Sequence, residues 1–559
     1  MATSIMKHFR VSTARAAAII VIAISALAFI ASVYRLLHTR AEIVYTTIQD
    51  DSFYYILPAW NAFHHELVSF DLINKTYGFQ PGYFVALYLM APFASNAHGL
   101  TVISLIFNFL CYSLTGFVAY CAVKNAAPRK HLPPAIIGGL AAVAAFFANG
   151  LSYLSSQTGK ENALAALLLS VAIYISQRLR SFEPPRESLK GFVLLGAVFA
   201  LLALTRIHPA TAISMALIAL YSVDNRVFSR KSVAIGITFF ALFAPWFLFS
   251  KAYFGNAFPT SGALKSGSFG LNIDGISSYY GYLQTYLERI AKFTFGYPNS
   301  FFLLQTDVDK FTPQASLPAK LLAWLSIALA SIAMLYSIAP VGREDRSFRS
   351  FVRLCSTLFT GSFVGHALLL WNYAKWAYAT DYFTWYIYDT PLLASLLAGC
   401  GAAVLVYMLQ ERRQIRYWPV AAVTLIAACC WCVVRDARPQ SDYPYGGFQG
   451  VAYGITQEIK NGKYPECAHG LVGSYSSGLI GLELGGRVVN LDGLANDTAA
   501  RVRMSGGSIP TLLSEQKIGC FIEVAELLPH HPDYETKVLG QYPMGNTKIV
   551  VAALKYHQP

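Results

Sequence analysis

The sequence predicts a polytopic α-helical membrane protein of about eleven transmembrane helices, followed by a small C-terminal α/β domain. Three observations lead to this fold class. The chain of 559 residues is 55% hydrophobic and only 13% charged, whereas soluble domains carry roughly 25% charged residues. Apolar runs long enough to cross a bilayer recur from residue 16 to residue 434. After residue 434 the composition changes to that of a water-soluble segment.

A membrane helix needs about 20 apolar residues, and this length defines the expected spans. The first run follows Lys7, Arg10 and Arg15 and is longer than the apolar core of a cleaved signal, so we interpret it as an uncleaved span. Residues 79–92 are apolar but short, and we expect them to form a helix at the membrane interface. The expected spans are 16–37, 99–123, 134–152, 161–178, 189–205, 209–223, 231–250, 319–338, 349–373, 384–408 and 418–434.

Loop charges predict the topology. Cationic residues collect in cytoplasmic loops, and every second loop is basic; these segments are 129–130, 177–186, 226–231, 343–349 and 411–416. The N-terminus is then cytoplasmic. The same bias accounts for the formal net charge of +13, so we do not expect nucleic acid as a partner. Three polar segments fall on the opposite face, namely 38–98, 251–318 and 435–559.

The C-terminal segment shows a different pattern. Helical spacing is visible in Phe448–Lys460, and short strands are expected at 471–473, 487–491, 520–524 and 548–554, between Gly and Asp turns. We therefore divide the chain into a membrane module, 1–434, and a soluble outer α/β domain, 435–559. No internal repeat or low-complexity stretch is evident.

Seven of the nine cysteines lie in or beside apolar runs and are expected to be core residues. The other two, Cys467 and Cys520, could form one disulfide if the C-terminal segment faces an oxidising compartment. The cysteine spacing is not typical of a metal site. The adjacent histidines at 64–65 and 530–531 would point apart on a helix, which argues against metal ligation by either pair.

The segment Asp50-Asp51-Ser-Phe-Tyr-Tyr55 lies just after the first span. Placing an ionised aspartate near hydrocarbon costs free energy, and such a residue usually has a functional role. One aspartate could simply cap the helix expected at 52–65. Both cannot cap it, so we expect the other to face a pocket, where an ionised carboxylate can act as a general base.

Glu161, in Gly159-Lys-Glu161, falls at the outer end of a span, on the same side as Asp50. Two interpretations remain open: a substrate-binding carboxylate, or a residue that complements the helix dipole with Lys160 as its partner. On the same side, Arg206-Ile-His208 connects two spans. Arg206 and His208 could bind an anion; the alternative is snorkelling at the interface.

The long outer loop contains a Gly-, Pro- and Ser-rich turn that ends in Lys265. Its backbone N–H groups and Lys265 could hold a phosphate, although a solvated loop lysine is the alternative. Tyr386 lies among aromatics at the start of the tenth expected span and could stack on a sugar, but aromatic belts are common at this depth. In the C-terminal segment, 473–478 is not a hydrolase elbow, and Asp492 is expected to cap a turn rather than to contact an acceptor.

Five motifs together resemble those of bacterial GT-C class glycosyltransferases. These are membrane enzymes that use polyprenyl-phosphate sugars, such as protein mannosyltransferases, the lipid A aminoarabinose transferase and rhizobial galacturonosyltransferases. The motifs occur in the order typical of the family and span most of the chain. They are Asp50-Asp51-Ser-Phe-Tyr-Tyr55, Tyr77-Gly-Phe-Gln-Pro81, Gly159-Lys-Glu161, the loop Gly255-Asn-Ala-Phe-Pro-Thr-Ser-Gly-Ala-Leu-Lys265 and Val488-Val-Asn-Leu-Asp492-Gly-Leu.

The resemblance implies a sugar transfer with inversion on the periplasmic face of a bacterial inner membrane. It implies Asp50 as the base, Asp51 as the residue that places acceptor or water, and Lys265 and Arg206 as phosphate ligands. The implied partners are a polyprenyl-phosphate-linked sugar donor, a glycan, lipid or protein acceptor of the cell envelope, and membrane lipids. Family members often have Arg-x-Asp where this chain has Arg206-Ile-His208, so the role of His208 is open.

No cofactor is implied with certainty, and a divalent cation stays an open alternative. Two other functions compete with glycosyl transfer. A lipid or glycan transporter would be expected to show inverted repeats and charges at the membrane midplane, and neither is evident here. A non-catalytic envelope-assembly protein would leave Asp50, Asp51 and Lys265 unexplained. The sequence identifies neither the sugar nor the acceptor, the length of the carrier lipid or the oligomeric state.

Overall fold

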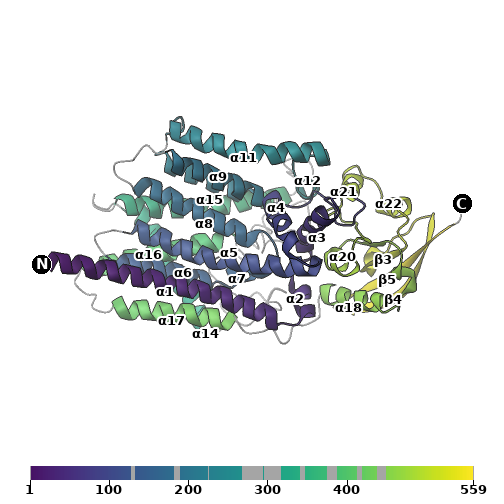
Figure 1. Ribbon diagram of the computed structural model, residues 1–559, viewed down its shortest axis with the longest axis horizontal. Coiled ribbons are helices and arrows are strands. Elements are labelled where there is room, and N and C mark those ends of the chain that lie inside the picture. The colour runs from purple at the N-terminus through teal and green to yellow at the C-terminus, as the bar shows by residue number, and fades with distance from the viewer. Residues whose placement is uncertain are drawn as a thin grey trace.

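The computed structural model describes residues 2–127, 132–181, 189–224, 226–266, 294, 317–339, 346–373, 387–411, 418–436 and 448–557. A bundle of long helices forms most of the molecule (Figure 1). The N-terminus lies at one end of this bundle, and the C-terminal part, which contains all the strands of the described residues, lies at the other. Short helices fill the space between them. The candidate site lies in this intermediate layer.

Each predicted span contains most of a helix, although the one expected at 134–152 runs past the end of its helix at Ala148. Seven described helices are long and apolar enough to cross a membrane, and the others are shorter, so the number of spans stays a prediction. The helices are α1 (Ala2–His38), α5 (Ala97–Ala126), α6 (Leu132–Ala148), α8 (Asn162–Ser181), α9 (Lys190–Thr205), α10 (Pro209–Ser222), α11 (Arg230–Phe254), α14 (Leu317–Ile338), α15 (Arg346–Tyr373), α16 (Thr390–Glu411) and α17 (Trp418–Asp436).

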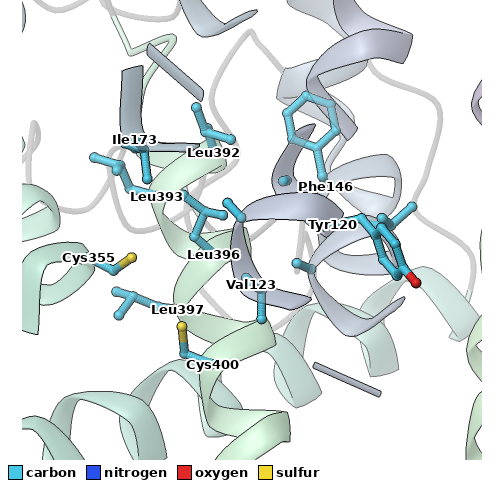
Figure 2. Close-up of a cluster of buried hydrophobic side chains, with 14 of the residues drawn as sticks. Tyr120, Val123, Phe146, Ile173, Cys355, Leu392, Leu393, Leu396, Leu397 and Cys400 are labelled. Atoms are coloured by element: carbon cyan, nitrogen blue, oxygen red, sulfur yellow. The ribbon is translucent and has the colours of Figure 1, made fainter. Parts of the chain in front are cut away.

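The helices α6 and α16 pack against each other at the centre of the bundle. A Cβ added at Gly138 would lie 2.8 Å from the carbonyl oxygen of Gly399, and one added at Gly399 would lie 2.6 Å from that of Gly138. Small residues allow this close approach of two helices, as is common in membrane bundles. Figure 2 shows the surrounding core, where Leu396 and Cys400 of α16 are fully buried with Val123 of α5.

Five short helices accompany the long ones, and three of them, α2, α3 and α12, contact helices of the C-terminal part (Figure 1). The helix predicted at 79–92 corresponds to α4 and the following 3-10 turn, and its depth in a membrane stays a prediction. The five are α2 (Ala41–Thr47), α3 (Asp50–His64), α4 (Pro81–Met90), α7 (Gly150–Gln157) and α12 (Thr260–Ser266).

The C-terminal part contains a five-stranded sheet of order β2-β1-β3-β5-β4. Strand β1 (Val472–Ser474) pairs in parallel with β2 (Val488–Asn490) and β3 (Cys520–Val524), while β5 (Thr547–Tyr556) is antiparallel to β3 and β4 (Tyr534–Met544). The helices are α18 (Phe448–Lys460), α19 (Pro465–Ala468), α20 (Gly478–Leu484), α21 (Asp497–Met504) and α22 (Ile509–Glu515).

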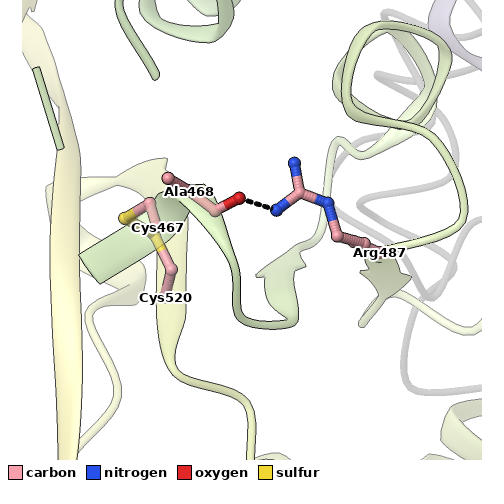
Figure 3. The surroundings of a disulfide bond; sticks show 4 residues. All are labelled: Cys467, Ala468, Arg487 and Cys520. Atoms are coloured by element: carbon pink, nitrogen blue, oxygen red, sulfur yellow. Dashed lines mark hydrogen bonds between the residues drawn. A yellow bond between two sulfur atoms is a disulfide. The ribbon is translucent and has the colours of Figure 1, made fainter. Parts of the chain in front are cut away.

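The sequence predicts α18 and four of these strands but not β4. This strand lies at the edge of the sheet, most of its residues are at least partly exposed, and its pairing is irregular between Val538 and Gly540. An edge strand of this kind lacks the apolar pattern on which the prediction depends. The open possibility of a disulfide is confirmed, because Cys467 and Cys520 are bonded and join α19 to β3 (Figure 3).

The C-terminal part is not merely tethered to the bundle. Leu479 and Ile480 of α20 belong to the same buried hydrophobic cluster as Leu57 of α3 and Phe70 of the first long loop. A Cβ at Gly481 would lie 2.4 Å from the Phe70 ring, so α20 packs directly against that loop. This shared core fixes the C-terminal part against α3 and the first long loop.

Candidate functional site

The turn 158–161, between α7 and α8, is held in place by residues of other helices. Gly159 has φ +69°, a conformation that favours glycine. The Tyr83 hydroxyl donates to the carbonyl of Gly159 at 3.0 Å, and the Asn108 side chain donates to the carbonyl of Lys160 at 2.9 Å. These contacts fix the backbone from which the Lys160 and Glu161 side chains project.

Two ion pairs meet at this turn. Lys160 Nζ lies 3.0 Å from Asp51 Oδ2, and the Arg206 guanidinium bonds to Glu161 Oε1. Glu161 is fully buried, Arg206 is 5% exposed and Lys160 is 4% exposed, whereas Asp51 is 25% exposed. The sequence interpretation that paired Glu161 with Lys160 is therefore wrong. Asp51 is the member of this group that solvent or a substrate can reach most easily.

Arg206 is positioned by its neighbours on both sides. The backbone N–H of Ile207 donates to the Gln80 side chain at 3.0 Å, which links the connection between α9 and α10 to the start of α4. The Arg206 guanidinium lies 5.8 Å from the centre of the Tyr388 ring. The Tyr388 hydroxyl in turn is 2.6 Å from Thr211 Oγ1. Sequence reasoning missed Tyr388 because its partners are distant in the chain.

His208 caps the N-terminus of α10. Its Nδ1 accepts from the backbone N–H of Ala210 at 3.0 Å, and its ring centre lies 4.8 Å from that of His366. His366 Nε2 is 2.8 Å from the buried carboxylate of Asp389. Aspartate is among the residues preferred at a helix N-cap, and here the imidazole supplies the acceptor. Substrate binding by His208 stays a prediction, while capping is its observed contact.

Asp50 makes a contact that the sequence did not indicate. The helix α3 begins at Asp50, its N-cap is Gln49, and no side chain caps it, so the prediction that one aspartate caps this helix is wrong. The Asp50 carboxylate instead accepts from the backbone N–H groups of Gly478 and Leu479 and from the Tyr54 hydroxyl, each at 3.0 Å. Burial raises the pKa of Asp50 to about 6, although these hydrogen bonds lower it.

A third carboxylate, Asp492, lies near the acidic pair. Asp492 Oδ1 accepts from the N–H of Leu494 at 2.6 Å, which confirms the predicted turn cap. Burial, together with the negative charges of Asp51 and Asp50, raises the pKa of Asp492 to about 7, although hydrogen bonds with Leu494 and Asn490 lower it. The turn after β2 therefore faces the same site as α3.

Lys265 lies on α12, and its side chain is outside the part of the chain that the structure describes. The start of α12 is anchored, because Thr260 donates its backbone N–H to the carbonyl of Tyr77 at 2.8 Å and its hydroxyl to Asp497 at 3.0 Å. Tyr386 falls outside the described residues. Among the described residues no group of three or more His, Cys, Asp or Glu side chains could hold a metal ion; the open question of a divalent cation stays open.

No protein-family model and no curated protein sequence matches the chain. Solved structures do match it. The archaeal oligosaccharyltransferase AglB from Archaeoglobus fulgidus, solved with an inhibitory peptide and a dolichol-phosphate, is 10% identical, with a TM-score of 0.52 over 93% of this chain and 70% of its own. ArnT from Cupriavidus metallidurans, in the apo state, is 11% identical, with a TM-score of 0.44 over 99% of this chain and 98% of its own. The likeness to AglB shows a shared fold.

Proposed function

We propose that this chain, which has the fold of the GT-C glycosyltransferases, moves a sugar from a polyprenyl-phosphate donor to a glycan, lipid or protein acceptor. The transfer would take place with inversion on the periplasmic face of a bacterial inner membrane. One observation carries the proposal: two ion pairs, Asp51 with Lys160 and Glu161 with Arg206, bring together the start of α3, the turn 158–161 and the connection between α9 and α10.

This set of charges fits the chemistry of the proposed reaction. The phosphate of a lipid-phosphate sugar is already a good leaving group, so no general acid is needed. The reaction requires a base for the acceptor hydroxyl and cations for the departing phosphate. AglB was solved with a dolichol-phosphate, and a polyprenyl-phosphate is the corresponding lipid in our proposal for this chain.

We assign the base to Asp51 rather than to Asp50. A base must come within hydrogen-bond reach of the proton that it removes. The Asp50 carboxylate already accepts three hydrogen bonds from the protein, whereas Asp51 is 25% exposed. The ammonium group of Lys160, 3.0 Å from Asp51 Oδ2, holds this carboxylate in place.

Cations for the phosphate are available around this base. Lys160 and Arg206 stand at the site itself, and Lys265 is carried by α12, whose start is fixed to the first long loop. Arg206 is paired with Glu161, so in our proposal Lys265 supplies the charge that balances the donor phosphate, and Arg206 supplies hydrogen-bond donors. The donor would reach the site from the bilayer, with the N-terminus and the basic loops in the cytoplasm.

The proposal is tested with purified protein in liposomes that contain a labelled polyprenyl-phosphate sugar. Asp51→Asn keeps the shape of the side chain and removes its charge, so we expect transfer to fall at least ~100-fold, the scale of a general base. Asp224→Asn is the control, because Asp224 pairs with Arg180 on α8 and is 60% exposed. Equal transfer by Asp51→Asn and wild type would exclude Asp51 as the base. No transfer from any donor, together with lipid movement across the bilayer, would favour a transporter.

A further inference from the structure

The turn between β1 and α20 is held by two carboxylates that come from different parts of the molecule. Glu523 of β3, which is 2% exposed, accepts from the backbone N–H groups of Tyr475 at 3.0 Å and Ser476 at 2.8 Å. Asp50 of α3 accepts from the N–H groups at the other end of the same turn, at 478 and 479. We call residues 474–479 the clamped turn. One carboxylate belongs to the C-terminal sheet and the other to the membrane module.

The backbone of the clamped turn lies too close to α3 for a side chain. A Cβ added at Gly478 would lie 2.2 Å from the carbonyl oxygen of Asp50 and 2.7 Å from its Oδ1. The Asn490 side chain closes the contact, because it donates to the Ser477 hydroxyl at 2.8 Å and to the Tyr54 hydroxyl at 3.2 Å. The contact between α20 and α3 is thus specific in its backbone and in its side chains, and Figure 1 shows the two helices next to each other.

The clamped turn brings residues of the C-terminal part close to the proposed base. The carbonyl of Tyr475 accepts from the Tyr54 hydroxyl at 3.3 Å, one turn along α3 from Asp50. Asp492, on the turn after β2, is close enough to Asp51 that the negative charge of Asp51 raises the pKa of Asp492. In the proposed reaction the donor lipid comes from the side of the membrane helices, which leaves these residues of the C-terminal part to contact the acceptor.

We propose that Asp50 is a positioning residue, which holds the clamped turn against α3. It thereby fixes the position of Asp51 and of the residues Tyr475 and Asp492, which form a wall that contacts the acceptor. This inference rests on the proposed glycosyl transfer and adds to it a role for the C-terminal part. The membrane module alone would bind the donor but would lack the part of the acceptor site that Tyr475 and Asp492 form. The ligand of this wall is the hydroxyl-bearing end of the acceptor.

The first test compares two glycine substitutions in the C-terminal part. Gly478→Ala places a methyl group against Asp50, whereas Gly454→Ala adds one on an exposed position of α18, with open space around it. A displacement of about 1 Å at a reacting group can cost about 100-fold in rate, so we expect a fall of that order in kcat for Gly478→Ala. The KM for the donor should stay unchanged. The Gly454→Ala variant should behave as wild type, and wild-type kcat for Gly478→Ala would overturn the proposal.

The second test separates a positioning residue from a base. The titratable groups around Asp50 are Asp51 and Tyr54 on its own helix, Asp492 after β2 and Glu523 on β3. If Asp51 is the base, Asp51→Asn should remove the acid limb of the pH profile of kcat/KM. The Asp50→Asn variant should lower kcat but keep that limb. Loss of the limb in Asp50→Asn, with the limb kept in Asp51→Asn, would overturn the assignment.

Hydrogen exchange tests the clamp without any turnover. In wild type the amides of Gly478 and Leu479 donate to Asp50 and should exchange slowly, and Asp50→Ala should make them exchange faster, while amides of β5 stay protected. Unchanged exchange at 478–479 would show that Asp50 does not hold the turn. If the wild-type protein transfers no sugar and yet shows this exchange pattern, the proposed function fails and the clamp stands.

Discussion

Replacement of Arg206 by alanine tests whether the buried ion pair at the site is needed for folding, for transfer or for both. The guanidinium is the partner of Glu161, which is fully buried. Removing one partner of a buried pair leaves an uncompensated charge and costs about 3–5 kcal/mol. The corresponding fall in the ratio of folded to unfolded protein is roughly 10²- to 10³-fold or more.

The assay is the thermal unfolding of purified protein in detergent, followed by intrinsic fluorescence, beside the transfer assay. Arg206→Ala should unfold at a clearly lower temperature than wild type. The double variant Arg206→Met with Glu161→Gln carries no buried charge, so its stability should return close to that of wild type, while transfer should stay lost because the phosphate ligand is missing.

A matched control is available in the same bundle. Arg180 pairs with Asp224 at 2.7 Å, but these side chains are 30% and 60% exposed. Exposed pairs contribute about 0–1 kcal/mol. Because Arg180 also donates to the carbonyl of Tyr221, the control variant is Asp224→Asn, which removes only the exposed carboxylate and should shift the unfolding temperature little. If Arg206→Ala were as stable as wild type, or if the double variant were no more stable than the single one, Glu161 would not need Arg206 to compensate its buried charge, and the interpretation would be wrong.

Two further predictions concern the C-terminal part. Burial would raise the pKa of Glu483, but hydrogen bonds from His98 and Lys460 outweigh it and lower that pKa to about 2. Because this pKa is lowered, the ionised carboxylate stabilises the fold above the unfolded value of 4.5, and this stabilisation is lost as the pH falls towards 2. Its partners His98 and Lys460 are 34% and 39% exposed, so Glu483→Gln should lower the free energy of unfolding at pH 7 by roughly 1–2 kcal/mol and have little effect at pH 2. The disulfide between Cys467 and Cys520 closes a loop with a separation of 53 residues. Reduction, or the double variant Cys467→Ser with Cys520→Ser, should therefore lower the free energy of unfolding by about 4 kcal/mol. An unfolding midpoint that does not change on addition of reductant would contradict this prediction.

Much of the architecture could be predicted because its signals are local. An apolar run of sufficient length forms a helix whatever it later packs against, and the helix Phe448–Lys460 was predicted with its observed bounds. The edge strand β4 could not be predicted, because its place is set by pairing with β5 and not by its own pattern. Its half-exposed residues resemble those of a polar loop.

The sequence indicated candidate site residues but not which of them interact with each other. A charged residue at the end of an apolar run is a candidate functional residue, because placing a charge near hydrocarbon costs free energy. This reasoning led to Asp50, Asp51, Glu161 and Arg206. The pairing of Lys160 with Asp51 joins residues 109 positions apart. Sequence distance instead suggested Lys160 as the partner of its neighbour, Glu161, and this was wrong.

The sequence by itself determined the helices of the bundle, the strands β1, β2, β3 and β5, and which ionisable residues lie next to the apolar runs. These properties depend on local hydrophobicity and on the free energy of single charges. Only the tertiary structure decided that Asp50 holds a turn 428 residues away, and that Asp51 is the carboxylate left partly exposed. Hydrogen bonds and ion pairs need atoms within about 3 Å of each other, and which distant segments come that close depends on how the whole chain packs.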